Sequence, residues 1–234
     1  LPLGLQFSIL AVGIIVMQGA VVRFDIAENG IMVPGTPAQN GFSAANKLIN
    51  FLMALYNGLA SAILGFNAQN YGKSDYRRIR QGTRQSLIIM LIMYAFCLTA
   101  GLLLSIGGAY QHIFMSEDKI SEASVRFGNT YLYVDFILYF ILGFLIVTRS
   151  AVQGITKVGY VLGAGVAELV SRVLICAYLP ALVNGGATDA SASLASFAAV
   201  CFGVPGAWLL ASLVLLVPTV KYIFRMQYKK EVSG

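Results

Sequence analysis

Residues 41–85 decide the fold of this chain, and they read GFSAANKLINFLMALYNGLASAILGFNAQNYGKSDYRRIRQGTRQ. The first two thirds of this stretch are predominantly apolar over more than the about 20 residues that a helix needs to cross the hydrocarbon core of a bilayer. The last third is rich in lysine and arginine, which is typical of a cytoplasmic loop. The stretch therefore predicts a membrane-spanning helix over residues 44–68 and gives that helix an orientation.

The composition places the whole chain in the membrane class. Of its 234 residues 58% are hydrophobic and only 11% are charged, whereas about a quarter of the residues of a soluble domain are charged. The other apolar runs long enough to cross a bilayer are residues 2–22, 86–110, 129–148, 158–183 and 195–220. We therefore predict an all-α polytopic membrane protein, a single six-helix bundle over residues 1–234, with Pro205 kinking the last helix near its start.

The lysines and arginines of the predicted loops are divided unequally between the two sides. Eleven fall on one side and three on the other. The first set is Lys73, Arg77, Arg78, Arg80, Arg84, Arg149, Lys157, Lys221, Arg225, Lys229 and Lys230, and the second is Arg23, Lys119 and Arg126. The positive-inside rule places the larger set in the cytoplasm, so we expect both ends of the chain there. The net charge of +6 is then explained by loops beside a bilayer, and we expect no nucleic-acid partner.

A line of amides marks the predicted helix over residues 44–68. Asn46, Asn50, Asn57 and Ser61 fall within a stripe about 40° wide. A polar stripe on an apolar helix indicates a face turned to an aqueous cavity, and the alternative is hydrogen bonding between packed helices. Lys47 lies one position off the stripe, and we expect its ammonium group to snorkel to the interface.

One carboxylate falls inside the predicted helix over residues 129–148. Asp135 shares a stripe with Tyr131, Tyr139, Arg149 and Gln153. It lies about five residues from the outer end, or roughly 8 Å deep, so an interfacial position is one interpretation. The other is a cation or proton site, because a carboxylate binds Na⁺ or is neutralised by H⁺. Tyr139, one turn deeper, is expected to present its hydroxyl to the same cavity.

A second pair of charges falls inside the helix over residues 158–183. Glu168 and Arg172 are four residues apart, a spacing that allows a direct ion pair within a helix. Mutual neutralisation favours a structural role for this intramembrane pair, and the alternative is a gate that breaks and forms again.

No residue pattern indicates enzyme chemistry or a metal site. Cys97, Cys176 and Cys201 all lie in apolar runs and are expected to be buried small hydrophobes. His112 has no histidine or cysteine neighbour at ligand spacing. We therefore expect a protein that is not an enzyme and has no cofactor.

Four stretches resemble the second half of a multidrug and toxic compound extrusion (MATE) transporter of the bacterial DinF-like branch. They are LPLGLQFSILAVGIIVMQGAVV (1–22), SAANKLINFLMALYNGLASAILGFNAQNYGKSDYRRIRQG (43–82), LGFLIVTRSAVQGITKVGYVLGAGVAELVSRV (142–173) and GVPGAWLLASLVLLV (203–217). The resemblance implies twelve helices in two six-helix lobes that export cationic or amphipathic drug-like compounds by alternating access, driven by Na⁺ or H⁺. This chain would be the C-terminal lobe, its partner the N-terminal lobe of the same parent chain, and its location a bacterial cell membrane.

The resemblance also carries over single residues. In some members an acid on the tenth helix contributes to a cation site, and Asp135 lies on the corresponding helix. The first helix here carries Gln18 and no acid, which departs from a family site that needs an acid there. We accordingly predict a pathway for substrate or cation that includes Gln18, Asn46, Asn50, Asn57, Asp135 and Tyr139.

Two other functions remain open on the sequence alone. A lipid-linked oligosaccharide flippase of the same superfamily would use arginines or lysines in its cavity to hold phosphate, but only Lys47 and Arg172 fall within predicted spans. A membrane scaffold without transport activity would turn its polar stripes toward helix contacts.

Overall fold

The computed structural model describes residues 2–225 of the chain, with side chains from residue 11 onward. Its regular elements are helical, apart from one isolated antiparallel bridge between Ile26 and Met32. They are α1 (Pro2–Val22), η1 (Arg23–Asp25), α2 (Pro37–Gly72), α3 (Tyr76–Ser105), η2 (Ile106–Gly108), α4 (Ala109–Phe114), η3 (Glu117–Lys119), α5 (Glu122–Ile137), α6 (Tyr139–Gly154), α7 (Val158–Asn184), α8 (Leu194–Cys201), α9 (Gly203–Pro218) and η4 (Thr219–Phe224).

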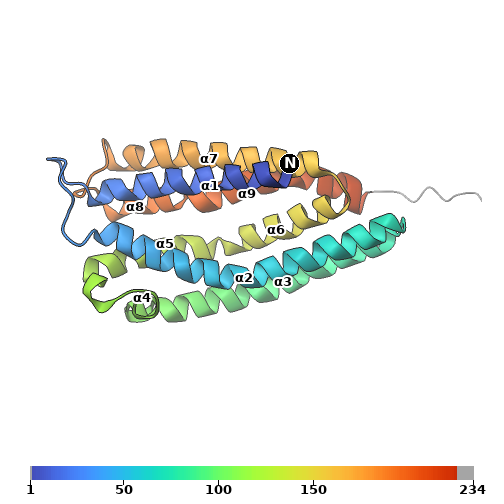
Figure 1. The fold of residues 1–234 in the computed structure, drawn as a ribbon, viewed down its shortest axis with the longest axis horizontal. Helices are drawn as coiled ribbons and strands as arrows, with labels where there is room; N and C mark the ends of the chain where they lie inside the picture. The colour runs from blue at the N-terminus through green and yellow to red at the C-terminus, as the bar shows by residue number, and fades with distance from the viewer. Residues whose placement is uncertain (1, 226–234) are drawn as a thin grey trace, which may run out of the picture.

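The helices run along the length of an elongated bundle (Figure 1). Helices α1, α7, α8 and α9 lie along one side, α2, α3 and α5 lie along the other, and α6 contacts both α2 and α9. Where the two sides meet, the ring of Tyr139 packs edge to face against the rings of Tyr56 and Trp208, at centroid distances of 5.2 and 5.9 Å. The core therefore lies along α6.

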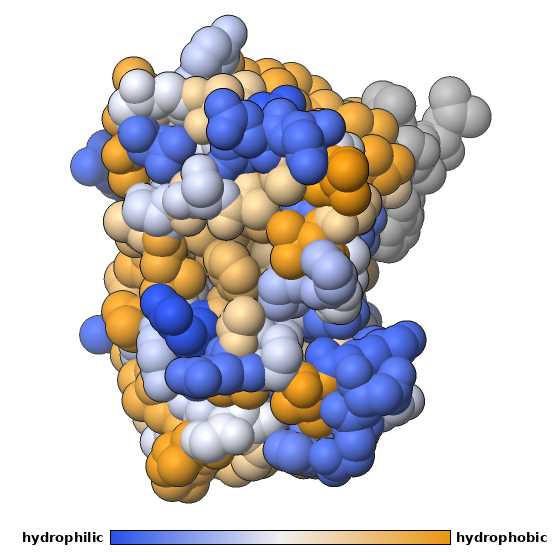
Figure 2. Space-filling model, turned by 90° about the vertical axis from the view of Figure 1, so that its left-hand side faces the viewer, coloured by the Kyte–Doolittle hydropathy of each residue, from blue (hydrophilic) through white to orange (hydrophobic). Residues whose placement is uncertain are grey.

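The two ends of the bundle differ in charge. The α2–α3 and α6–α7 connections lie at one end, which also holds the end of η4 and toward which the start of α1 points (Figure 1). We call it the basic end, because Lys73, Arg77, Lys157, Lys221 and Arg225 lie on these segments. The opposite end carries the α1–α2 and α7–α8 connections and the segment between α3 and α5. Figure 2 shows hydrophilic side chains gathered over parts of this end. Lys229 and Lys230 lie outside the described residues.

Large parts of the outer surface of the bundle are apolar. Phe51, Ile92 and Leu182 each expose 66–76% of their surface, as expected of side chains that face lipid. Four helical stretches of the described chain are long and apolar enough to span a membrane, and α5 with α6 makes a fifth if this bent pair is one span. The chain is therefore an all-α polytopic membrane protein, whereas the count of six spans stays a prediction.

Helix α2 extends beyond the predicted range of 44–68 at both ends. Helix α3 begins at Tyr76, before the predicted start at residue 86, and ends at Ser105, before the predicted end at residue 110. The predicted basic loop is mostly helix, and only Lys73–Asp75 connect α2 to α3. Asp75 caps α3 by accepting the Arg78 N–H at 3.0 Å. Asn67 and Asn70, which belong to the NAQNYG segment, are buried in the last turns of α2, and Asn67 donates to the Thr83 hydroxyl at 3.1 Å. This segment is thus a junction between two helices.

Two of the predicted helices are interrupted. The predicted helix over 129–148 is instead the pair α5 and α6, which meet at Leu138 at an angle of 51°. The last helix divides at Phe202 into α8 and α9, three residues before Pro205. This interruption lies where proline is expected to disturb a helix, because proline lacks the N–H for the helical hydrogen bond and its ring crowds the preceding turn, and a kink at this position stays a prediction.

Candidate functional site

The break between α5 and α6 organises the candidate site. Leu138 has φ −97° and ψ 5°, and neither proline nor glycine stands beside it. The hydroxyl of Tyr94, on α3, donates to the carbonyl of Ile137 at 3.0 Å. A side chain that enters the helical hydrogen-bond ladder is a known cause of a kink. The break places Asp135 in the last turn of α5 and Tyr139 at the start of α6.

Asp135 is fully buried. Neither of its carboxylate oxygens has a hydrogen-bond partner among the described residues. The guanidinium of Arg172, on α7, is the charged group that interacts with it electrostatically. Because α5 begins at Glu122, Asp135 lies thirteen residues into the helix, or roughly 20 Å along its axis. The burial of its side chain inside the lobe favours the interpretation as a cation or proton site, whereas its depth in the bilayer stays a prediction.

Tyr139 is also buried, but its hydroxyl has another partner. It donates to the carbonyl of Ile49, on α2, at 3.3 Å. We expected this hydroxyl to face the same cavity as Asp135, and the structure instead uses it to join α6 to α2. The side chain stays close to the acid, with which it interacts electrostatically.

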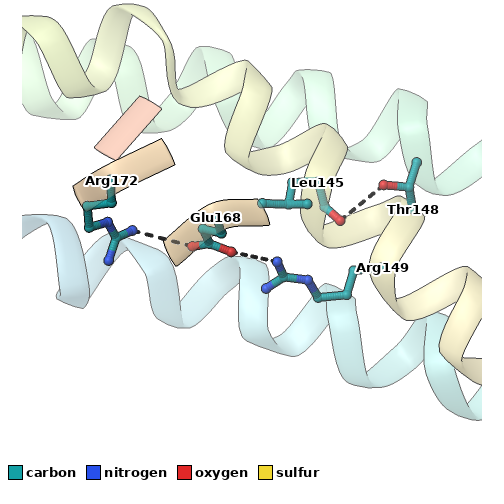
Figure 3. A network of polar contacts seen from close by, with 5 residues as sticks. All are labelled: Leu145, Thr148, Arg149, Glu168 and Arg172. Carbon is teal, nitrogen blue, oxygen red and sulfur yellow. Dashed lines mark hydrogen bonds and ion pairs between the residues drawn. The ribbon is translucent and has the colours of Figure 1, made fainter. Parts of the chain in front are cut away.

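The predicted ion pair on α7 is part of a larger network (Figure 3). Glu168 accepts a hydrogen bond from Arg172 at 3.3 Å, as the i, i+4 spacing predicted. It accepts a shorter one, 2.7 Å, from Arg149 on α6. The guanidinium of Arg172 lies against Gly13 of α1, where a Cβ would come within 2.9 Å of Arg172 Nη1. Glu168 therefore joins α6 to α7, and Arg172 fills the space beside α1.

The role of Arg149 in this network was not predicted. Arg149 follows the apolar run and was therefore assigned to a loop, but α6 continues to Gly154. The signal was present, because Arg149 falls on the same helical stripe as Asp135 and Tyr139.

The predicted amides lie at the surface of the lobe, whereas Asp135 is buried. Asn50, Asn57 and Gln18 are exposed, and Asn46 is half buried. None of the four side chains forms a hydrogen bond with the described residues. The structure thus separates the predicted pathway into a buried acid with its arginine neighbours and an exposed line of amides.

Lys47 and the three cysteines of the predicted spans are the other residues to place. Lys47 is exposed and donates to the carbonyl of Phe114, at the C-terminal end of α4, at 3.0 Å, whereas its position at a membrane interface stays a prediction. Cys97, Cys176 and Cys201 are buried with free thiols, as predicted.

A cavity of about 270 Å³ reaches into the bundle from the end opposite the basic end. Small side chains of α1 and α7 line most of it, and Arg23 is its one charged lining residue. Cys176, which also lines it, is one helical turn from Arg172. The cavity therefore approaches the arginine beside Asp135.

A comparison with protein-family models identifies the family. The model named MatE matches residues 32–178, which include Asp135, Arg149, Glu168 and Arg172. The chain belongs to the MatE family. This family includes multidrug efflux transporters, and its members are transporters and not enzymes. Comparisons with curated proteins and with solved structures found no match.

Membership of the MatE family fits the chemistry of the site. The described residues contain no group of three or more histidine, cysteine, aspartate or glutamate side chains that could hold a metal ion. They do contain one buried carboxylate without a hydrogen-bond partner, that of Asp135. Such a residue inside a membrane span commonly marks an ion pathway.

Proposed function

We propose that this chain is the C-terminal six-helix lobe of a cation-coupled multidrug efflux antiporter of the DinF-like branch. It would act with an N-terminal lobe in a bacterial cell membrane, with its basic end in the cytoplasm. Inward movement of H⁺ or Na⁺ would drive the outward movement of amphipathic or cationic compounds by alternating access.

The proposal rests on the burial of Asp135 and on the lack of hydrogen-bond donors to its carboxylate. An ionised carboxylate without hydrogen-bond donors in a membrane interior is strongly unfavourable. Asp135 is fully buried and no described residue donates to it. The carboxyl is therefore stable when it is protonated or holds a cation, and an exchange between such states couples ion movement to the protein. The break at Leu138 supports this role, because interrupted helices commonly form ion sites in transporters.

The placement of the other polar groups supports efflux over the two alternatives. A flippase needs cavity cations free to hold phosphate, but Arg149 and Arg172 both pair with Glu168. A scaffold needs polar stripes in helix contacts, but Asn50 and Asn57 are exposed on the lobe. An exposed amide stripe suits a face turned to a cavity shared with a second lobe.

The test is the substitution Asp135→Asn in the full-length protein, reconstituted in liposomes with an imposed H⁺ or Na⁺ gradient. Asparagine has nearly the same shape but neither ionises nor binds a cation strongly. We expect gradient-driven efflux to fall at least about tenfold with expression unchanged. The control is Asp189→Asn, because Asp189 lies in the exposed loop between α7 and α8 and bonds only its neighbour Ser191 and nearby backbone. Unchanged efflux in the Asp135 variant would remove Asp135 from the mechanism.

A further inference from the structure

A cluster of cations and tyrosines lies at the basic end, far from Asp135. The ammonium group of Lys157, just before α7, is 5.0 Å from the ring centroid of Tyr222 on η4. The ammonium group of Lys221 is 5.1 Å from the same centroid. The ring of Tyr160, on the first turn of α7, is 6.0 Å from that of Tyr222. Two segments that are distant in sequence thus bring two positive charges to one aromatic ring.

Among the described residues, no carboxylate forms an ion pair with this cluster. The ion pairs among the described residues involve His112, Arg149 and Arg172, but neither lysine of the cluster. Two like charges held near one ring repel each other, and an anion between them would relieve that repulsion. The cluster therefore has the electrostatics of an anion site.

The surface beside the cluster is open. A shallow depression of about 460 Å³ is lined by residues 156–160. A Cβ added at Gly159 would meet no atom within 4 Å, and the same holds one turn further along α7 at Gly163. The depression has room for a headgroup, and the glycines leave open space beside it on α7.

The position of the cluster favours a lipid over a soluble anion. Tyrosines are enriched where membrane-spanning helices leave the hydrocarbon, at the level of the headgroups. Val217, one turn before Lys221, exposes 62% of its surface, and Leu216 exposes 43%. Exposed apolar side chains thus lie next to the charged groups of the cluster. A phospholipid has the same arrangement, with its acyl chains next to its charged headgroup. A zwitterionic headgroup would bring an ammonium group that two lysines repel.

We propose that Lys157, Lys221, Tyr160 and Tyr222 form a binding site for the phosphate of an anionic phospholipid in the leaflet at the basic end. The lysines hold the phosphate and the tyrosines flank it, while the acyl chains lie along the exposed faces of α7 and α9. The bound lipid connects the α6–α7 turn to the end of α9. The site is independent of the proposed efflux function.

The test is native mass spectrometry of the full-length protein in detergent, titrated with phosphatidylglycerol or with phosphatidylcholine. We expect Lys157→Gln with Lys221→Gln to weaken phosphatidylglycerol binding about thirtyfold and to leave phosphatidylcholine binding unchanged. The charge-matched control is Lys73→Gln with Arg77→Gln, because both residues are exposed at the same end. We expect this control to weaken binding less than about threefold.

Three outcomes would overturn the proposal. Equal losses in the two glutamine pairs would show that general surface charge, and not this cluster, attracts the lipid. Displacement of phosphatidylglycerol by millimolar glycerol phosphate would show a site for a soluble phosphate. The pair Lys157→Arg with Lys221→Arg keeps both charges, so we expect it to keep most of the binding. If it stays folded but loses as much as the glutamine pair, the lysine charges are not what binds the lipid.

Discussion

Replacing Glu168 by glutamine should destabilise the folded lobe more than removing either of its arginine partners. The Glu168 side chain is only 5% exposed, and its partners Arg149 and Arg172 are 15% and 8% exposed. The substitution leaves two guanidinium groups largely buried without their shared carboxylate. Removing one member of a buried ion pair costs about 3–5 kcal/mol, because the remaining charge stays desolvated. Arg172→Gln leaves the 2.7 Å contact between Glu168 and Arg149, so its cost should be about 1–3 kcal/mol.

The assay is unfolding of the purified full-length protein in mixed micelles of increasing SDS content, followed by circular dichroism. Glu28→Gln is the control, because Glu28 lies exposed in the loop after α1, and its free energy of unfolding should stay within about 0.5 kcal/mol of the unmodified protein. A loss below about 1 kcal/mol for Glu168→Gln, or a loss no larger than that of Arg172→Gln, would refute the reasoning. If efflux then also slowed, the network would act as a gate and not as a structural tie.

Two further predictions concern packing and helix capping, and the same unfolding assay tests both. A Cβ at Gly41 would collide with the backbone of α5, whereas one at Gly58 would meet no atom within 4 Å. Gly41→Ala should therefore lower the free energy of unfolding by about 1–3 kcal/mol, and Gly58→Ala should leave it unchanged or raise it by up to about 1 kcal/mol. Equal effects of the two substitutions would contradict this packing. The buried carboxylate of Asp25 accepts the N–H groups of Ala38 and Gln39 at 2.9 and 2.8 Å. Asp25→Ala should cost about 1–2 kcal/mol and speed hydrogen exchange at these two amides, and unchanged exchange there would show that the cap does not hold the start of α2.

Helix limits were predictable where a change of composition coincides with the end of the helix. The predicted range 2–22 matches α1, which is followed by the charged residue Arg23, and the range 158–183 matches α7 to within one residue. Hydropathy detects the part of a helix that lies in lipid and not the helix itself. The backbone hydrogen bonds of α2 and α3 continue beyond the apolar residues, so Arg77, Arg78, Arg80 and Arg84 lie on α3 and not in a loop. The count of basic residues on the two sides of the membrane does not change when these four arginines are helical.

The break at Leu138 was not predictable, because its local sequence contains no helix breaker. The hydroxyl that bonds to Ile137 comes from Tyr94, 43 residues earlier in the chain. Only the tertiary fold brings these groups together. The same holds for Arg149 and Glu168, which lie on different helices, whereas the contact of Glu168 with Arg172 follows from spacing within one helix.

The charges inside the bundle connect the buried network to the proposed coupling. Glu168 offsets only one of its two arginine partners, so this network alone carries one excess positive charge. Asp135, which interacts electrostatically with Arg172, offsets that charge when it is ionised. A proton or a cation on Asp135 cancels this attraction and leaves Glu168 as the carboxylate partner of Arg172. We would then expect Arg172 to move toward Glu168 or toward the cavity that Cys176 lines. Because Arg172 lies against Gly13 of α1 and shares Glu168 with Arg149 of α6, such a movement is a physical route from ion binding to the packing of α7 against α1 and α6.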